Sequence, residues 1–151
     1  MNSPKRSQSR SAARLAAVQA LYQYEMEGTQ TAILLDQFHQ HRLGGTLEED
    51  EQLAEAEVEF FDDVAGGAIA RIEEIDEVLS LRLAEGWTLK RLDKTMLQIL
   101  RCGAYELIAR PDVPVGSAIS EYVDVAHAFF DQREAKFVNG VLDGVAKEVR
   151  N

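Results

Sequence analysis

The first residues whose types and spacing suggest chemistry are basic and lie near the start of the chain. Residues 1–14 contain no acidic side chain and four basic ones, Lys5, Arg6, Arg10 and Arg14, so this stretch has a formal charge of +4. Such side chains bind phosphate oxygens, the contacts that dominate affinity for nucleic acid. The 151-residue chain has a net charge of −10, so the other 12 bases and 26 acids give the rest −14. A basic segment on an acidic body predicts localised phosphate contact.

A second group lies in the run Lys136-Phe137-Val138-Asn139-Gly140, where helical periodicity continues through an amide and a glycine that are poor helix formers. One interpretation is a ligand surface that contains Lys136 and Asn139. The alternative is that Asn139 bonds across a helical bundle or faces water, while Gly140 and Gly144 admit a closely packed neighbouring helix. The spacing alone does not decide between them.

The two groups together predict a surface for single-stranded RNA. Phosphates would contact Arg10 and Arg14, and unstacked bases would contact the rings of Tyr22 and Tyr24 and the amide of Asn139. The alternative for the arginines is a solvated helix start without function, although cations there oppose the helix dipole. Duplex DNA is less favoured because no recognition helix with base-reading side chains stands out.

Catalytic and metal-binding patterns do not stand out in the sequence. There is no glycine-rich phosphate loop, no cysteine pair and no His-x-x-x-His pair. His39 and His41 are two residues apart, so on a helix they point to different sides. His127 lies between alanines in an amphipathic stretch, where a surface or partly buried histidine is expected. We therefore expect a binding protein that is not an enzyme and has no cofactor or metal.

The single cysteine, Cys102, falls within an apolar helical pattern, which predicts a buried thiol and a reducing compartment. No apolar run reaches the length of a membrane span, and the N-terminus lacks the apolar core of a signal peptide. We therefore expect a cytoplasmic location with no membrane contact.

Helical periodicity predicts an all-α bundle of about seven helices, and no segment alternates as a strand would. We expect a flexible basic arm over residues 1–8 and a single helical domain over residues 9–151. The predicted helices cover about residues 9–28, 31–41, 53–84 with a kink at Gly66-Gly67, 94–109, 119–130 and 131–149.

Local signals define several ends of these helices. Asp93 is expected to cap the helix that follows it, and Asp131 with Glu134 has the spacing of a capping box. The stretch 87–92 is expected to form a turn or a single helical turn that places the indole of Trp87 against the core. The acidic stretch 48–63 is expected to be a solvated face.

Four motifs, in order along nearly the whole chain, resemble those of the NusB family of bacterial transcription antitermination factors. They are Arg14-Leu-Ala-Ala-Val-Gln19-Ala-Leu-Tyr22, Arg101 followed by Tyr105-Glu106-Leu107, Asp112-Val113-Pro114 with Ala118-Ile119 and Glu121, and Lys136-Phe137-Val138-Asn139-Gly140-Val141-Leu142. The last is the most specific. Two departures are the sparse Arg-Ser-Ala-Ala-Arg pattern and Met96, which replaces an acid common in the family.

The resemblance implies two packed helical halves that bind boxA single-stranded RNA of ribosomal RNA transcripts. It implies NusE, a small-subunit ribosomal protein, as partner, in a complex with RNA polymerase and other Nus factors. By the same resemblance the RNA-binding residues are Lys5, Arg6, Arg10, Arg14, Gln19, Tyr22, Lys136, Phe137 and Asn139, and the partner-binding residues are Asp93, Arg101 and Glu106.

Three alternatives accompany this reading. The chain could be a protein–protein adaptor, or a homodimer that buries its RNA surface. It could also be the NusB-like module of a ribosomal RNA cytosine methyltransferase, but 151 residues leave no room for a cofactor-binding α/β domain, so we do not expect this.

Overall fold

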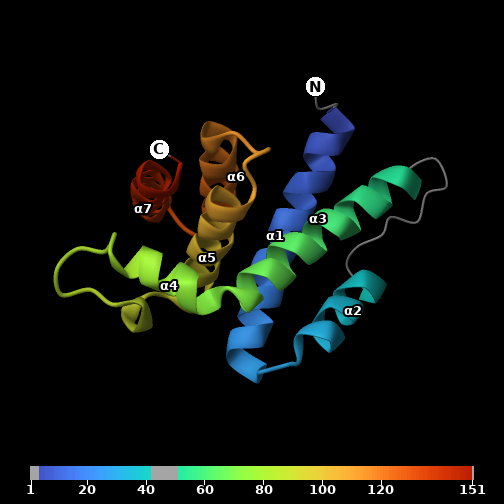
Figure 1. Ribbon diagram of the computed structural model, residues 1–151, viewed down its shortest axis with the longest axis horizontal. Coiled ribbons are helices and arrows are strands. Elements are labelled where there is room, and N and C mark those ends of the chain that lie inside the picture. The colour runs from blue at the N-terminus through green and yellow to red at the C-terminus, as the bar shows by residue number, and fades with distance from the viewer. Residues whose placement is uncertain (1–3, 42–50, 151) are drawn as a thin grey trace. The chain divides into compact units, whose positions relative to one another are not determined.

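The computed structural model describes residues 4–41 and 51–150 (Figure 1). Within these ranges there are seven α-helices, one short 3-10 helix and no strand, which confirms the predicted all-α class. The helices are α1 (Pro4–Glu27), α2 (Thr31–His41), α3 (Glu51–Ala70), α4 (Ile72–Ser80), η2 (Leu89–Arg91), α5 (Lys94–Ala109), α6 (Val115–Phe129) and α7 (Gln132–Val149). The chain divides into two compact units, Met1–Ile69 and Ala70–Asn151.

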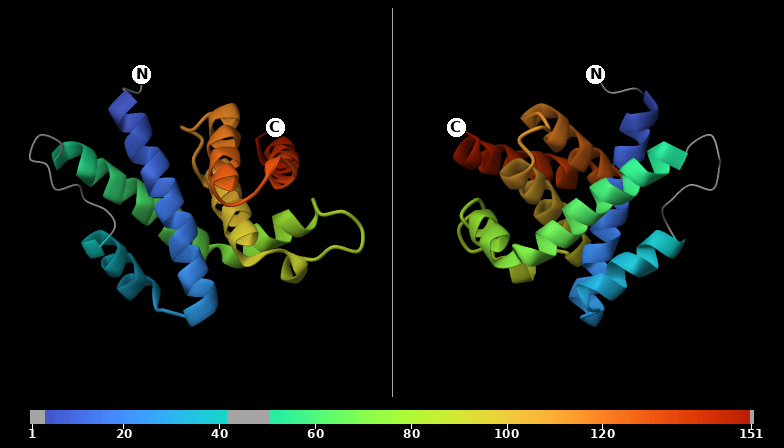
Figure 2. Two further views of the ribbon diagram at one scale, coloured as in Figure 1. Left: turned by 180° about the vertical axis from the view of Figure 1, so that it is seen from behind. Right: turned by 45° about the vertical axis from the view of Figure 1, so that its right-hand side comes forward.

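The first unit contains α1, α2 and α3, and α1 crosses α3 in every view (Figures 1 and 2). Phe38 of α2 stacks on Phe61 of α3 with 5.4 Å between ring centroids, and a 2.5 Å hydrogen bond joins His39 Nε2 to Asp62 Oδ1. α1 ends where Gly28 adopts a left-handed conformation, φ +69°, and donates its N–H to the Tyr24 carbonyl. The helix begins at Pro4, five residues before the predicted start.

The predicted long helix over residues 53–84 is wrong. Two helices occupy this range, and the break falls at Arg71, with φ −111° and ψ 24°, rather than at Gly66-Gly67. Apolar spacing continues across the break, so periodicity alone does not reveal it. The break lies beside the boundary between the units, and α4 packs its buried Ile75 and Leu79 in the second unit, where it contacts α5. The break therefore coincides with the boundary between the two units.

The second unit is organised around α5, which contacts α4, α6 and α7 and is buried from Met96 to Leu107. Asp93 caps it as predicted: its Oδ1 accepts hydrogen bonds from the N–H groups of Thr95 at 2.8 Å and Met96 at 3.2 Å. The capping box of α7 is also confirmed, with the Asp131 N–H donating to Glu134 Oε1 at 3.2 Å. Local sequence signals therefore set these helix starts correctly.

The surroundings of Cys102, Gly140 and Gly144 in this unit can be compared with the predictions made for these residues. Cys102 is fully buried as predicted, and burial raises the pKa of its thiol. A side chain added at Gly140 would meet no atom within 4 Å, and one added at Gly144 would meet Arg82 Cδ at 2.8 Å. Gly140 therefore admits no neighbouring helix, whereas Gly144 makes room for the side chain of Arg82, which follows α4, rather than for a helix backbone. Among the described helices, none combines the length and apolar content that crossing a membrane requires.

Candidate nucleic-acid interface

The predicted basic segment is helical where the structure describes it, and two of its arginines pack on α3. Arg10 and Arg14 are one turn apart on α1, and their guanidinium carbons lie 4.6 Å and 4.9 Å from the ring centroid of buried Phe60. Cation–π contact of this kind fixes a guanidinium against an aromatic face. Arg14 is only 4% exposed, so it is a core residue of this unit, whereas Arg10 is half-buried.

This placement refines the prediction that both arginines form an exposed cationic end. Arg10 is the more accessible of the pair, while Arg14 holds α1 against α3 through Phe60. Lys5 and Arg6 belong to the first turns of α1, and their side chains lie outside the described part of the chain.

An acidic side chain of α3 approaches the same part of α1. The hydroxyl of Ser9 donates to Glu57 Oε1 over 3.4 Å, and partial burial raises the pKa of Glu57 despite this hydrogen bond. Glu57 is therefore an acidic neighbour of this part of α1, joined to it through Ser9.

Farther along α1, the ring of Tyr22 is 40% exposed and Gln19 is half-buried. Gln23, which follows Tyr22, points toward α2, where its Nε2 donates to Gln37 Oε1 at 3.0 Å. Tyr22 therefore presents an aromatic surface that the internal packing of this unit does not use completely.

In the second unit, α7 presents the predicted Lys-Asn face. Lys136, Asn139 and Gly140 are exposed, while Ala135 and Val138 on the other side of the helix are buried. The alternative that Asn139 bonds across the bundle is therefore wrong. Phe137 is 36% exposed, so its ring belongs to the surface side of the helix rather than to the core.

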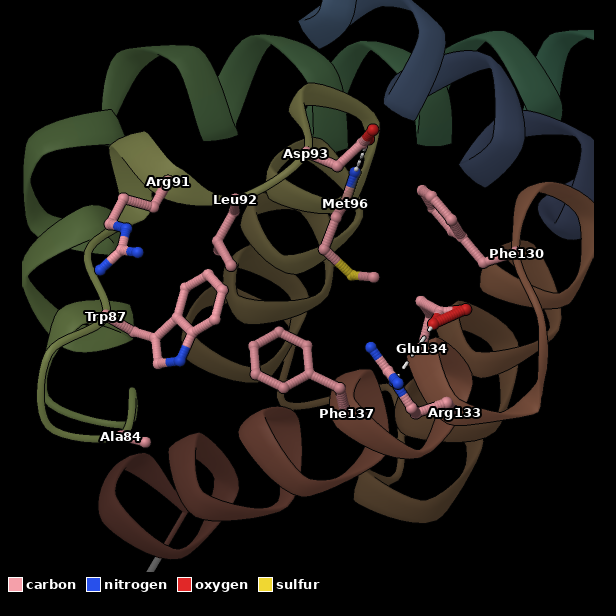
Figure 3. A pocket seen from close by; sticks show the side chains of 10 residues that line it. All are labelled: Ala84, Trp87, Arg91, Leu92, Asp93, Met96, Phe130, Arg133, Glu134 and Phe137. Atoms are coloured by element: carbon pink, nitrogen blue, oxygen red, sulfur yellow. Dashed lines mark hydrogen bonds and ion pairs between the residues drawn. The ribbon is translucent and has the colours of Figure 1, made fainter.

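Phe137 lines a groove of about 460 Å³ that lies within the second unit (Figure 3). The walls come from the segment that leads through η2, from the start of α5 and from the α6–α7 junction. The lining residues are Ala84, Trp87, Arg91, Leu92, Asp93, Met96, Phe130, Arg133, Glu134 and Phe137.

The sequence did not reveal this groove because Trp87 was expected to pack against the core. The indole is instead 51% exposed and points across the groove toward Phe137 (Figure 3). A signal was present in the sequence, since residues 87–94 alternate an aromatic and apolar side chains with Lys90, Arg91 and Lys94.

Two of the three residues predicted to contact a partner are buried in this unit. Arg101 is 7% exposed and donates to both carboxylate oxygens of Asp76, at 2.8 Å and 2.7 Å. Glu106 is 0% exposed and accepts a hydrogen bond from the Tyr122 hydroxyl. Such burial is incompatible with direct partner contact, so we correct both assignments to core positions. Asp93 is exposed at the groove and stays a candidate.

The described residues contain no group of three or more side chains suited to hold a metal ion. What the chain does present is an all-helical scaffold with a basic, aromatic helix in one unit and an arginine-flanked aromatic groove beside a Lys-Asn face in the other. These features define a helical binding protein with candidate nucleic-acid surfaces in both units.

Comparison with known proteins makes this class specific. Residues 11–147 match the model of the NusB family, and the chain belongs to that family. It is 69% identical over 141 residues to the transcription antitermination protein NusB of Novosphingobium aromaticivorans, covering 93% of this chain and 95% of the relative. It is 47% identical to the corresponding protein of Caulobacter vibrioides, covering 97% of each chain.

Solved structures give the same assignment. A crystal structure of T. maritima NusB is similar with a TM-score of 0.71 and 30% identity, over 98% of this chain and 94% of that one. A crystal structure of antitermination factors NusB and NusE in complex with dsRNA is similar with a TM-score of 0.75 and 25% identity, over 93% of this chain and 98% of that one.

Proposed function

We propose that this protein is a transcription antitermination factor that binds the boxA segment of ribosomal RNA transcripts as single-stranded RNA. NusE, a small-subunit ribosomal protein, is its proposed partner, and RNA polymerase and other Nus factors complete the complex. It acts as a binding factor rather than as an enzyme, in the cytoplasm where transcripts are made. The observation that carries the proposal is the exposed run of Lys136, Phe137 and Asn139 beside the groove.

The chemistry of this run suits single-stranded RNA. The ammonium group of Lys136 supplies a donor and a charge for phosphate, and the amide of Asn139 supplies both a donor and an acceptor for a base edge. The exposed ring of Phe137 supplies a stacking surface between them. Sequence-specific RNA recognition mostly uses unstacked bases, which need this mixture of charge, amide and aromatic groups.

The first unit contributes a phosphate contact through Arg10 and an aromatic contact through Tyr22 under this proposal. Arg14 supports Arg10 indirectly, because both guanidinium groups pack on Phe60. Lys5 and Arg6 extend the same charge. These residues belong to the first unit, and the Lys-Asn face belongs to the second.

The test is a titration of fluorescein-labelled boxA RNA, followed by fluorescence anisotropy, with and without NusE. The double variant Lys136→Ala with Asn139→Ala should weaken binding, because it removes a phosphate contact and a base contact from an exposed face. Lys147→Ala is the matched control, since Lys147 is also an exposed lysine of α7 but pairs with Asp143 at 3.1 Å.

A protein–protein adaptor would leave the anisotropy of the RNA unchanged in both titrations, which would reject RNA binding. A homodimer that buries its RNA surface would show a doubled mass in solution that falls when RNA is added. Equal weakening by the control variant would mean that general charge, rather than the Lys-Asn face, causes the effect.

The salt dependence of binding provides a second measurement. Each lost phosphate contact should lower the slope of log affinity against log salt by about 0.7 for a single strand. Arg10→Ala should therefore reduce the slope, and an unchanged slope would reject a phosphate contact at this residue.

A further inference from the structure

We propose that the groove of the second unit holds one unstacked nucleobase of the bound RNA between Trp87 and Phe137. The inference rests on the proposed function and deepens it, because it assigns a part of the RNA to a specific site. It also adds Trp87 and Arg91 to the RNA-binding residues, which neither the motifs nor the Lys-Asn face indicated.

The two rings provide the stacking surfaces. Trp87 comes from the segment before η2 and Phe137 from α7, and their side chains point toward one another across the groove (Figure 3). Both rings keep substantial exposed area, and Leu92 and Met96 supply apolar surface between them. Exposed aromatic surface gathered in one hollow indicates a binding site rather than a core.

The indole is held in place before any ligand arrives. The guanidinium of Arg91 lies 4.9 Å from the ring centroid of Trp87, and Arg91 Nη1 donates to the carbonyl of Gly86 at 2.7 Å. Arg91 itself belongs to η2, so the short helix, the arginine and the ring form one arrangement. A ring that is already oriented loses less conformational entropy when a base stacks on it.

The charges around the groove favour a nucleotide over a neutral ligand. Arg91 lies beside Trp87 at one end of the groove and Arg133 lies at the α7 end, where each can meet a phosphate that flanks the base (Figure 3). The two carboxylates of the groove are already engaged. Asp93 caps α5 through the Thr95 N–H, while Glu134 accepts from the Asp131 N–H and its Oε2 lies 3.8 Å from Arg133 Nε (Figure 3).

The size and position of the groove agree with this occupant. Its volume of about 460 Å³ lies in the range of about 300–1,000 Å³ that small-molecule sites occupy. Phe137 is flanked on the exposed side of α7 by Lys136 and Asn139, so the groove continues the face proposed above to bind RNA. A single RNA strand bound along this face can therefore insert one base into the groove while its neighbouring nucleotides stay on the face.

The chain contains one tryptophan, which makes the proposal directly measurable. Stacking of a base on Trp87 should quench its fluorescence. Unlabelled boxA RNA should therefore cause saturable quenching whose dissociation constant equals the one obtained from the anisotropy of labelled RNA. The experiment uses the full chain, in parallel with and without NusE.

Three variants separate stacking from other effects. Trp87→Ala should weaken RNA binding by about 5- to 150-fold, the range of one base–aromatic stack. Trp87→Phe should restore most of the affinity, because a phenyl ring also stacks. Leu81→Ala is the matched control, since Leu81 is an exposed apolar residue near Trp87 in the chain that does not line the groove, and it should bind like the unmodified protein.

Each other outcome overturns the proposal. RNA binding without quenching, together with normal affinity of Trp87→Ala, would leave the proposed function intact and remove the base from the groove. Quenching by NusE alone, with Trp87→Ala weakening only NusE binding, would assign the groove to a protein partner. Failure of RNA to bind under any condition would reject the proposed function and this inference with it.

Discussion

Arg150 ties the end of α7 to the turn that follows α5, and its removal gives a quantitative test of the second unit. Its guanidinium donates to the carbonyls of Leu107 at 2.6 Å, Arg110 at 2.8 Å and Val113 at 3.0 Å, with a longer contact to Glu106 at 3.3 Å. Helix ends leave carbonyls without intrahelical partners, and one side chain satisfies several of them here.

The expected magnitude for Arg150→Met follows from these contacts. A hydrogen bond that involves a charged group contributes about 1.5–3 kcal/mol, but the contacts share one side chain and the site is only partly buried. We therefore expect a loss of about 2–4 kcal/mol rather than the sum of all four. For a chain of this length that loss corresponds to a decrease in melting temperature of roughly 4–16 °C.

Thermal melts followed by circular dichroism, with urea titrations to obtain the free energy of unfolding, measure this effect. Methionine keeps much of the aliphatic volume, so the variant isolates the guanidinium. Lys147→Met is the control, because Lys147 is an exposed cation of the same helix and should change stability by less than about 0.5 kcal/mol. If Arg150→Met unfolds within about 0.5 kcal/mol of the unmodified chain, water replaces the guanidinium at these carbonyls and the reasoning is wrong.

Three further predictions use the same measurements. Asp93→Ala should lower the free energy of unfolding by about 0.5–2 kcal/mol, because α5 loses its N-cap; Asp93→Asn should recover most of it. Phe137→Ala should cost only about 1–2 kcal/mol, less than a core phenylalanine, while Asn139→Ala should leave stability unchanged and weaken RNA binding; the reverse pattern in melts would refute the assigned faces. Burial raises the pKa of Glu57 above its unfolded value of 4.5, so the ionised carboxylate lowers the free energy of unfolding at neutral pH, whereas the protonated form below pH 4.5 does not. Glu57→Gln should therefore raise the free energy of unfolding at pH 7 and have little effect near pH 4.

The sequence was most informative where structure depends on neighbouring residues. The bounds 31–41 and 94–109 and the caps at Asp93 and Asp131 agree with the structure, because capping and periodicity act over one or two turns. The burial of Cys102 followed from its apolar helical neighbours in the same way.

The errors concern relations between distant segments. The break at Arg71 depends on which core each half of the predicted helix joins, and apolar spacing is the same on both sides. The burial of Arg14 depends on Phe60 of another helix, and that of Arg101 depends on Asp76. Sequence alone predicts that a charged residue lies on the surface, because such a residue is buried only when a partner, often distant in the sequence, pairs with it.

The candidate RNA surface also combines features that the sequence predicted with features that only the structure shows. The sequence by itself determined the all-helical class, the family motifs and the basic start of the chain, all of which depend on residue type and local period, whereas the exposure of Asn139 on α7 came from the structure. Only the tertiary structure decided that Trp87 leaves the core to face Phe137 across a groove, and that Glu106 is a buried partner of Tyr122. The physical reason is that a groove or a buried pair forms only when side chains from separate helices come together, and the spacing of residues along the chain does not predict which distant side chains meet.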